Sequence, residues 1–246
     1  MTEPTAPSAP PAVEKAGMLE DYIDIFIAPA KVFARRIDAN AFIPFLIVTV
    51  LLIGLFYASR NVMEPIFDQE ISRQLAKMAK DNAALAKPEA MESARKMMNI
   101  SFQWGAVIGM PILLLGLGII VWIVGKLFGA TATFGTAMMI TCYAWVPRVL
   151  SSVLTMVQLQ LLDPNKIEGM AGLSFGPARF LDADATSLGL MQLAMRFDLF
   201  TIWTTVLIVV GLVSAGKMPK SKAVPAGLTL FVVGSLTAIW ALIKGS

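Results

Sequence analysis

Long apolar stretches recur along this chain, and their length constrains the fold more than any other feature. A helix needs about 20 predominantly apolar residues to cross the hydrocarbon core of a bilayer. Five such segments are present, at residues 41–58, 100–125, 131–156, 198–216 and 223–243. Only 15% of the residues are charged, against about 25% in a typical soluble domain. The sequence therefore predicts an all-α fold, a polytopic membrane bundle of five transmembrane helices.

The residues before the first span predict a tail followed by a membrane-surface segment. Residues 1–17 are rich in proline and predict a flexible cytoplasmic tail, and residues 18–246 predict a single membrane domain. Apolar and charged side chains mix over residues 18–38, and a proline suits the first turn of a helix. We expect two short helices there, joined near Ala28 and lying in the lipid headgroup region. Three basic side chains would face lipid phosphates, or else a partner protein: Lys31, Arg35 and Arg36.

Residues 60–99 are polar and separate the first two predicted spans. A rough stripe of apolar residues runs between the charges, and Pro88 opens a second helix. We predict a helical hairpin outside the bilayer, whose second arm runs into the second span. Mixed charges of this kind are typical of a solvated face. A docking site for a partner is the alternative.

Lysine and arginine are distributed unevenly over the short loops, and cytoplasmic loops carry the excess of these residues. If the N-terminus is cytoplasmic, the inner loops hold Lys126, Lys217, Lys220 and Lys222. This distribution predicts a protein of the cytoplasmic (inner) membrane with its N-terminus inside the cell. Five spans then place the C-terminus, like the 60–99 hairpin, outside the cytoplasm.

One charge, Arg148, interrupts the third span. Charged groups at membrane depth are costly and need partners or a route to the interface. If the helix enters the hydrocarbon at Thr133, Arg148 lies roughly 22 Å farther on, at 1.5 Å per residue, close enough to the outer interface to snorkel. The alternative is a bidentate pair with Asp198, where the fourth span begins on the same side. Pro147 would open the helix locally and free a carbonyl nearby.

The residue inventory argues against several chemistries. The chain has no histidine, which is the commonest general base and metal ligand. Its single cysteine, Cys142, lies in an apolar helix and is typical of a small buried hydrophobe. We therefore predict no catalytic, cofactor-binding or metal site. The net charge of +3 is too small and too scattered for a nucleic-acid surface.

Three local motifs follow one another along the chain: IFIAPAKVFARR at 25–36, FGTAMMITCYAWVP at 134–147 and FDLFTIWTTVLIVVGL at 197–212. The first has a proline ahead of an apolar and basic helix. In the second Tyr143 precedes Pro147, and the third carries Asp198 and Trp203. These four residues, together with Arg148, are the candidate structural or functional residues.

The motifs and the five spans resemble the Yip domain family of Ypt/Rab-interacting membrane proteins, over about residues 18–243. The sequence looks more like a bacterial branch of that family. The resemblance implies a five-span fold with an amphipathic cytoplasmic N-terminus, and it implies no settled activity.

Three kinds of function are consistent with these observations. The favoured one is a non-enzymatic scaffold or accessory subunit of a membrane complex, such as an exporter or trafficking-like machinery. Its partners would be the lipid bilayer and another membrane protein. Assembly into a homo-oligomer is an alternative. The second is a transporter or channel for a small solute, with Arg148 and the threonines of the third span lining its path. An intramembrane enzyme is the least supported, because its base or second carboxylate at depth is not apparent in the spans.

Overall fold

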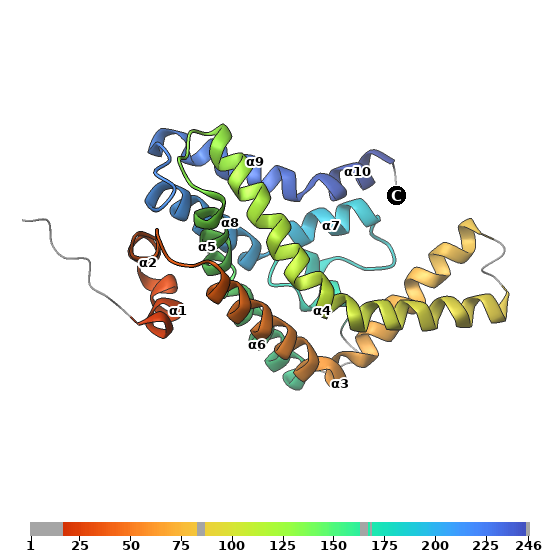
Figure 1. The fold of residues 1–246 in the computed structure, drawn as a ribbon. Coiled ribbons are helices and arrows are strands. Elements are labelled where there is room, and N and C mark those ends of the chain that lie inside the picture. The colour runs from red at the N-terminus through yellow and green to blue at the C-terminus, as the bar shows by residue number, and fades with distance from the viewer. Residues whose placement is uncertain (1–16, 83–86, 163–166, 168, 245–246) are drawn as a thin grey trace, which may run out of the picture.

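A computed structural model describes residues 17–82, 87–162, 167 and 169–244 of the protein. Over these residues the chain is helical, with turns and loops between the helices and no strand (Figure 1). The predicted all-α fold is confirmed. The predicted flexible tail, residues 1–17, falls outside the described residues except for its last position.

The N-terminal segment forms two short helices, α1 (Met18–Ile27) and α2 (Pro29–Arg35). They meet at Ala28, as predicted, and Pro29 occupies the first turn of α2, where its missing N–H is of no consequence. The two helices pack against the bundle, with α2 along α8 and α1 against α5 and α6.

The first two spans belong to two unusually long helices. α3 (Phe42–Asp81) and α4 (Pro88–Leu127) have 40 residues each, or roughly 60 Å at 1.5 Å per residue. That is about twice the hydrocarbon thickness of a bilayer. The predicted hairpin is present, but both of its arms, and not only the second, are continuous with a span. Figure 1 shows these arms projecting from the right side of the bundle.

The third span is broken into α5 (Phe134–Ala144) and α6 (Val146–Leu161) at Trp145. Taken together they are long and apolar enough to cross a membrane. α6 leads into a loop with two short 3-10 helices, η3 (Met170–Leu173) and η4 (Pro177–Phe180).

The fifth predicted span is a bent pair of helices, and the fourth, residues 198–216, is a single helix that follows a shorter one at an angle. α7 (Leu188–Arg196) meets α8 (Leu199–Ser214) at an angle of 53°. After η5 (Lys220–Lys222), α9 (Ala223–Gly234) meets α10 (Leu236–Lys244) at 52°. α10 turns back to pack along α7. The described residues thus contain three helices that could cross a membrane, or up to five spans if each bent pair is one.

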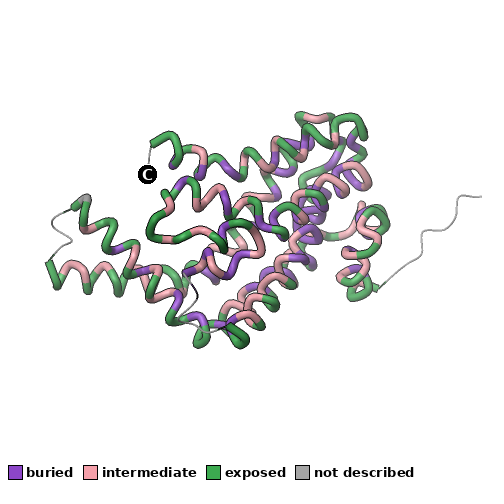
Figure 2. The backbone as a smooth tube through the Cα atoms, turned by 180° about the vertical axis from the view of Figure 1, so that it is seen from behind, coloured by how far each residue is buried: buried purple, intermediate pink, exposed green. Residues whose placement is uncertain are grey.

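The core lies around α5. Every residue from Thr136 to Ala144 is buried, and α5 packs on α3, α4 and α8. Figure 2 shows this concentration of buried backbone in the middle of the bundle, with green, exposed residues on the projecting arms. The polar residues of α5, such as Thr136 and Thr141, therefore face protein.

Candidate functional site

Arg148 is positioned by the break in the third span. The Thr133 hydroxyl caps the start of α5 by accepting the backbone N–H of Thr136 at 3.1 Å. The helix ends at Trp145, whose N–H still donates to the Thr141 carbonyl. Pro147 then falls in the first turn of α6, where a proline is tolerated. The predicted local opening at Pro147 is therefore observed just ahead of it, and it turns Arg148 toward α8.

Asp198 stands at the start of α8 and binds two backbone segments. Its Oδ1 accepts the N–H of Phe200 at 2.9 Å, which caps the helix. Its Oδ2 accepts the N–H of Phe175 at 2.8 Å, from the loop that precedes α7. The Ser174 hydroxyl donates to the same Oδ2 at 3.4 Å. This carboxylate therefore connects the loop before α7 to the start of α8, independently of any arginine.

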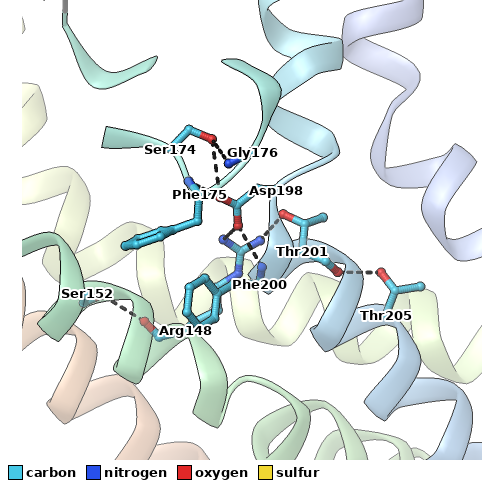
Figure 3. Close-up of polar contacts among 9 residues, drawn as sticks. All are labelled: Arg148, Ser152, Ser174, Phe175, Gly176, Asp198, Phe200, Thr201 and Thr205. Carbon is cyan, nitrogen blue, oxygen red and sulfur yellow. Dashed lines mark hydrogen bonds and ion pairs between the residues drawn. The ribbon is translucent and has the colours of Figure 1, made fainter. Parts of the chain in front are cut away.

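The Arg148 guanidinium reaches across to α8 (Figure 3). Its Nη2 donates to the Thr201 hydroxyl at 2.5 Å, and its Nη1 lies 3.9 Å from Asp198 Oδ1. The predicted contact between Arg148 and Asp198 exists, but it is a loose single contact, and the predicted bidentate geometry is wrong. The physical reason is that both Asp198 oxygens already accept backbone N–H groups. Thr201, which the sequence reasoning did not single out, is the closer partner.

A second arginine, Arg196 at the end of α7, was also missed. Its Nε donates to the Ser235 hydroxyl at 3.3 Å, and its guanidinium lies 5.3 Å from the ring centre of Phe231. It covers Gly234 so closely that a Cβ there would collide with it. The adjacent Gly234 and Ser235 indicated a kink in the last span, but nothing in the sequence indicated that Arg196 packs against it.

The two arginines line one cavity of about 90 Å³. Three threonines of α8, at 201, 204 and 205, line it as well. Among the residues of this cavity, Arg148 Nε and the Thr204 hydroxyl are buried and have no hydrogen-bond partner within the described structure. Buried polar groups are normally satisfied, so these two call for an explanation.

The remaining candidates, Tyr143 and Trp203, lie against α1 and not in this cavity. The Tyr143 ring stacks on Tyr22 with centroids 5.4 Å apart. Trp203 meets Phe26 edge-on at 5.3 Å. These two aromatic pairs attach the N-terminal helices to the third and fourth spans.

An ionic cluster, formed by Asp21, Asp24, Arg35 and Arg36, holds α1 to α2. Arg35 Nη2 lies 2.6 Å from an oxygen of each aspartate, and Arg36 Nε pairs with Asp21. Asp21 is fully buried. The hydrogen bond from Arg35 to Asp24 is the main cause of the raised pKa of the Arg35 guanidinium.

This cluster corrects the expectation that Arg35 and Arg36 face lipid phosphates, because both guanidinium groups are turned inward to carboxylates. The outer face of α1 instead presents Leu19, Ile23 and Ile27, which are 81%, 65% and 79% exposed. Two other faces of α1 contact protein, because Asp21 and Asp24 pair with α2 while Tyr22, Ile25 and Phe26 pack on the bundle. Lys31 is exposed, and its contact with headgroups stays a prediction.

The described residues contain no cluster of three or more His, Cys, Asp or Glu side chains that could hold a metal ion. Cys142 is a free thiol, buried in the core. What the site offers chemically is hydrogen-bond donors and positive charge between helices.

These features define a polytopic α-helical membrane protein whose third span is broken beside an arginine. The Yip1 domain model matches residues 23–242, so the chain belongs to the Yip1 domain family. No curated protein and no solved structure matches it.

Proposed function

We propose that the protein is a non-enzymatic scaffold or accessory subunit of a membrane complex, of the exporter or trafficking-like kind. The observation that carries this proposal is an apolar groove of about 530 Å³ between the projecting arms of α3 and α4. Four methionines line it: Met78, Met97, Met98 and Met170. Methionine adapts its shape to different partners and is common at adaptable binding surfaces.

The groove is suited to an apolar face of another protein. Met78 and Met97 are 47% and 71% exposed, so its walls are open to a partner that approaches from the side. An amphipathic helix binds such a groove through its apolar face. The same surface would serve a second copy of the chain, which is the homo-oligomer that we also consider.

Met78→Asp, in the chain isolated after cross-linking in its native membrane, tests the proposal. Ala76→Asp is the matched control, because it adds the same charge to an exposed position of the same helix outside the groove lining. We expect a stoichiometric membrane partner with the wild-type chain and with Ala76→Asp, and at least tenfold less of it with Met78→Asp, since a buried unpaired charge is strongly unfavourable. Equal recovery with both variants would rule out the groove.

A transporter built on the third span is the alternative. The cavity beside Arg148 measures about 90 Å³, whereas pockets for small molecules usually measure about 300–1,000 Å³. For this reason the scaffold is preferred. Flux of a solute into liposomes containing only this protein would favour the transporter.

We further propose five spans in the inner membrane of a bacterium, with the N-terminus in the cytoplasm and the C-terminus outside. Two basic loops support this orientation by lying at the same end of the bundle. The Thr131 N–H donates to the Gly216 carbonyl at 2.8 Å, and a Cβ at Gly129 would lie 3.7 Å from Lys222 Nζ. Lys126, in the last turn of α4, and Lys217 and Lys220, between α8 and α9, add positive charge at this end, as the positive-inside rule would require of the cytoplasmic side.

Labelling of single cysteines tests the orientation. In a Cys142→Ser background, a cysteine replacing Lys80 should react with an impermeant maleimide in intact cells. A cysteine replacing Lys220 should react only after the membrane is permeabilised. The opposite pattern would invert the topology and place the groove in the cytoplasm.

A further inference from the structure

The charge around the Arg148 cavity is not balanced. Arg148 and Arg196 both line it, and Asp198 is the only carboxylate with which either forms an ion pair among the described residues. That carboxylate lies 3.9 Å from Arg148 Nη1 and accepts two backbone N–H groups. Two positive charges against one negative charge leave a surplus of one positive charge beside the cavity.

Two buried hydrogen-bonding groups without partners in the described structure belong to residues that line the same cavity. Thr204 is only 6% exposed, and its hydroxyl has no partner. The buried Nε of Arg148 has none either. An unsatisfied buried polar group costs about 1–3 kcal/mol. A bound acceptor would remove both costs at once, and an anion would also compensate the surplus charge.

The cavity has the size and the walls for one small oxyanion attached to an apolar body. A cavity of about 90 Å³ is several times the volume of about 10–15 Å³ that one buried water needs. It lies beside the first turns of α8 and the kink between α9 and α10. The other side chains around it are aliphatic or aromatic: Leu117, Ile120, Val121, Trp145, Ile208, Leu230 and Val233.

We propose that this cavity binds a phosphate group, held between the guanidinium groups of Arg148 and Arg196 and the hydroxyl of Thr204. Guanidinium groups match the geometry of phosphate oxygens, and Thr204 supplies a donor that has no other role in the structure. The phosphate comes from a membrane phospholipid or from a free ion. This inference goes beyond the scaffold proposal and does not depend on it.

The test is thermal unfolding of the purified full chain in a neutral detergent, titrated with three probes. These are phosphatidylglycerol, monogalactosyldiacylglycerol with the same acyl chains and no phosphate, and inorganic phosphate against chloride at equal ionic strength. We expect the phospholipid to raise the melting temperature with a saturable midpoint and the phosphate-free lipid to leave it unchanged. A rise with inorganic phosphate alone would assign the site to the free ion, and a rise with only the phospholipid would assign it to a lipid headgroup.

Two variants weaken the site by different means. Arg196→Gln removes one charge and should shift the midpoint of the responding phosphate probe by about tenfold or more, the effect of losing a hydrogen bond to a charged group. Thr204→Val removes only the hydroxyl and should shift it several-fold.

The matched control is Thr49→Val. The Thr49 hydroxyl is also buried and without a partner, but Thr49 lies on α3, outside the cavity lining. Both valine variants should unfold at or above the wild-type temperature without a probe, and only Thr204→Val should respond less to phosphate. Equal stabilisation by both lipids with no effect of inorganic phosphate would overturn the proposal. A wild-type midpoint in both Arg196→Gln and Thr204→Val would overturn it as well.

Discussion

Two regions of this protein bury arginine beside aspartate, and they do so in opposite ways. In the ionic cluster of α1 and α2, two guanidinium groups meet two carboxylates, and Arg35 reaches both of them at 2.6 Å. Around the Arg148 cavity there are two guanidinium groups and one carboxylate, and only that of Arg148 forms an ion pair with it among the described residues, at 3.9 Å. The first arrangement is balanced in charge, although the buried Arg35 Nε has no partner in the part of the chain that the structure describes, while the second has a surplus positive charge as well as donors without partners.

The difference separates a structural role from a binding role. A charge-balanced cluster, which we call closed, has no surplus charge to attract an anion, and its four side chains fix the angle between two helices that are too short to be stable alone. In a cluster with surplus charge, which we call open, the desolvation cost of the buried charge is only partly offset by ion pairs. A protein tolerates such a cluster where a bound ligand provides the missing opposite charge. The same pair of residue types therefore has two functions, decided by the number of carboxylates and by what else they bind.

The largest effect is expected from Asp21→Asn. Asp21 is fully buried and pairs with both Arg35 and Arg36. Its neutralisation therefore removes one charged partner from each of two guanidinium groups. We expect a loss of about 3–5 kcal/mol in the free energy of unfolding, measured by denaturant titration in mixed micelles. Glu20→Gln removes an exposed carboxylate from the same helix and should leave the curve unchanged. Similar curves for the two variants would show that the cluster does not hold α1.

A smaller effect is expected from Asp198→Ala, of about 2 kcal/mol, because a helix cap and a backbone hydrogen bond are lost together. Ser187→Ala is the control, since the Ser187 hydroxyl caps only α7, through the Leu190 N–H at 3.4 Å. It should cost about 1 kcal/mol or less, in the same titration. Equal losses for the two variants would mean that the bond from Asp198 to the Phe175 N–H adds nothing.

The smallest effect is expected from Lys31→Gln. Lys31 is exposed and lies outside the ionic cluster, so the free energy of unfolding in neutral nanodiscs should change by less than about 0.5 kcal/mol. In nanodiscs of anionic lipid the free energy of unfolding of the variant should fall by about 1 kcal/mol more, because one lysine contributes about that much attraction to an anionic surface. The same change in both lipids would remove the last predicted headgroup contact of this segment.

Much of the third and fourth spans was predictable from individual residues. Pro147 inside an apolar run indicated an opening in the helix, and the break lies at Trp145. Asp198 at the boundary of an apolar run indicated a helix start, and it caps α8. Proline and a short acidic side chain act on the backbone next to them, so their effect can be predicted without knowledge of the fold.

What could not be predicted depends on contacts between distant segments. Apolar periodicity predicts an amphipathic α1, but which side faces outward is decided by the pairing of Asp21 and Asp24 with Arg35 across the turn at Ala28. The sequence did not indicate that the apolar first half of α3 continues without a break into its polar second half, because the two halves differ so much in composition. Arg196 lies beside Arg148 because α7 packs near the bend between α9 and α10, where Arg196 contacts Gly234 and Ser235.

Two double-mutant cycles measured side by side test the difference between the clusters most directly. One cycle combines Asp21→Asn with Arg35→Gln, and the other combines Asp198→Asn with Arg148→Gln, all in the same mixed micelles without added lipid. Because Arg35 and Asp21 are in direct contact and Arg148 bonds mainly to Thr201, we expect a coupling of about 2 kcal/mol or more in the first cycle and about 1 kcal/mol or less in the second. Equal couplings, or a larger one between Arg148 and Asp198, would contradict the division into a closed cluster and an open one.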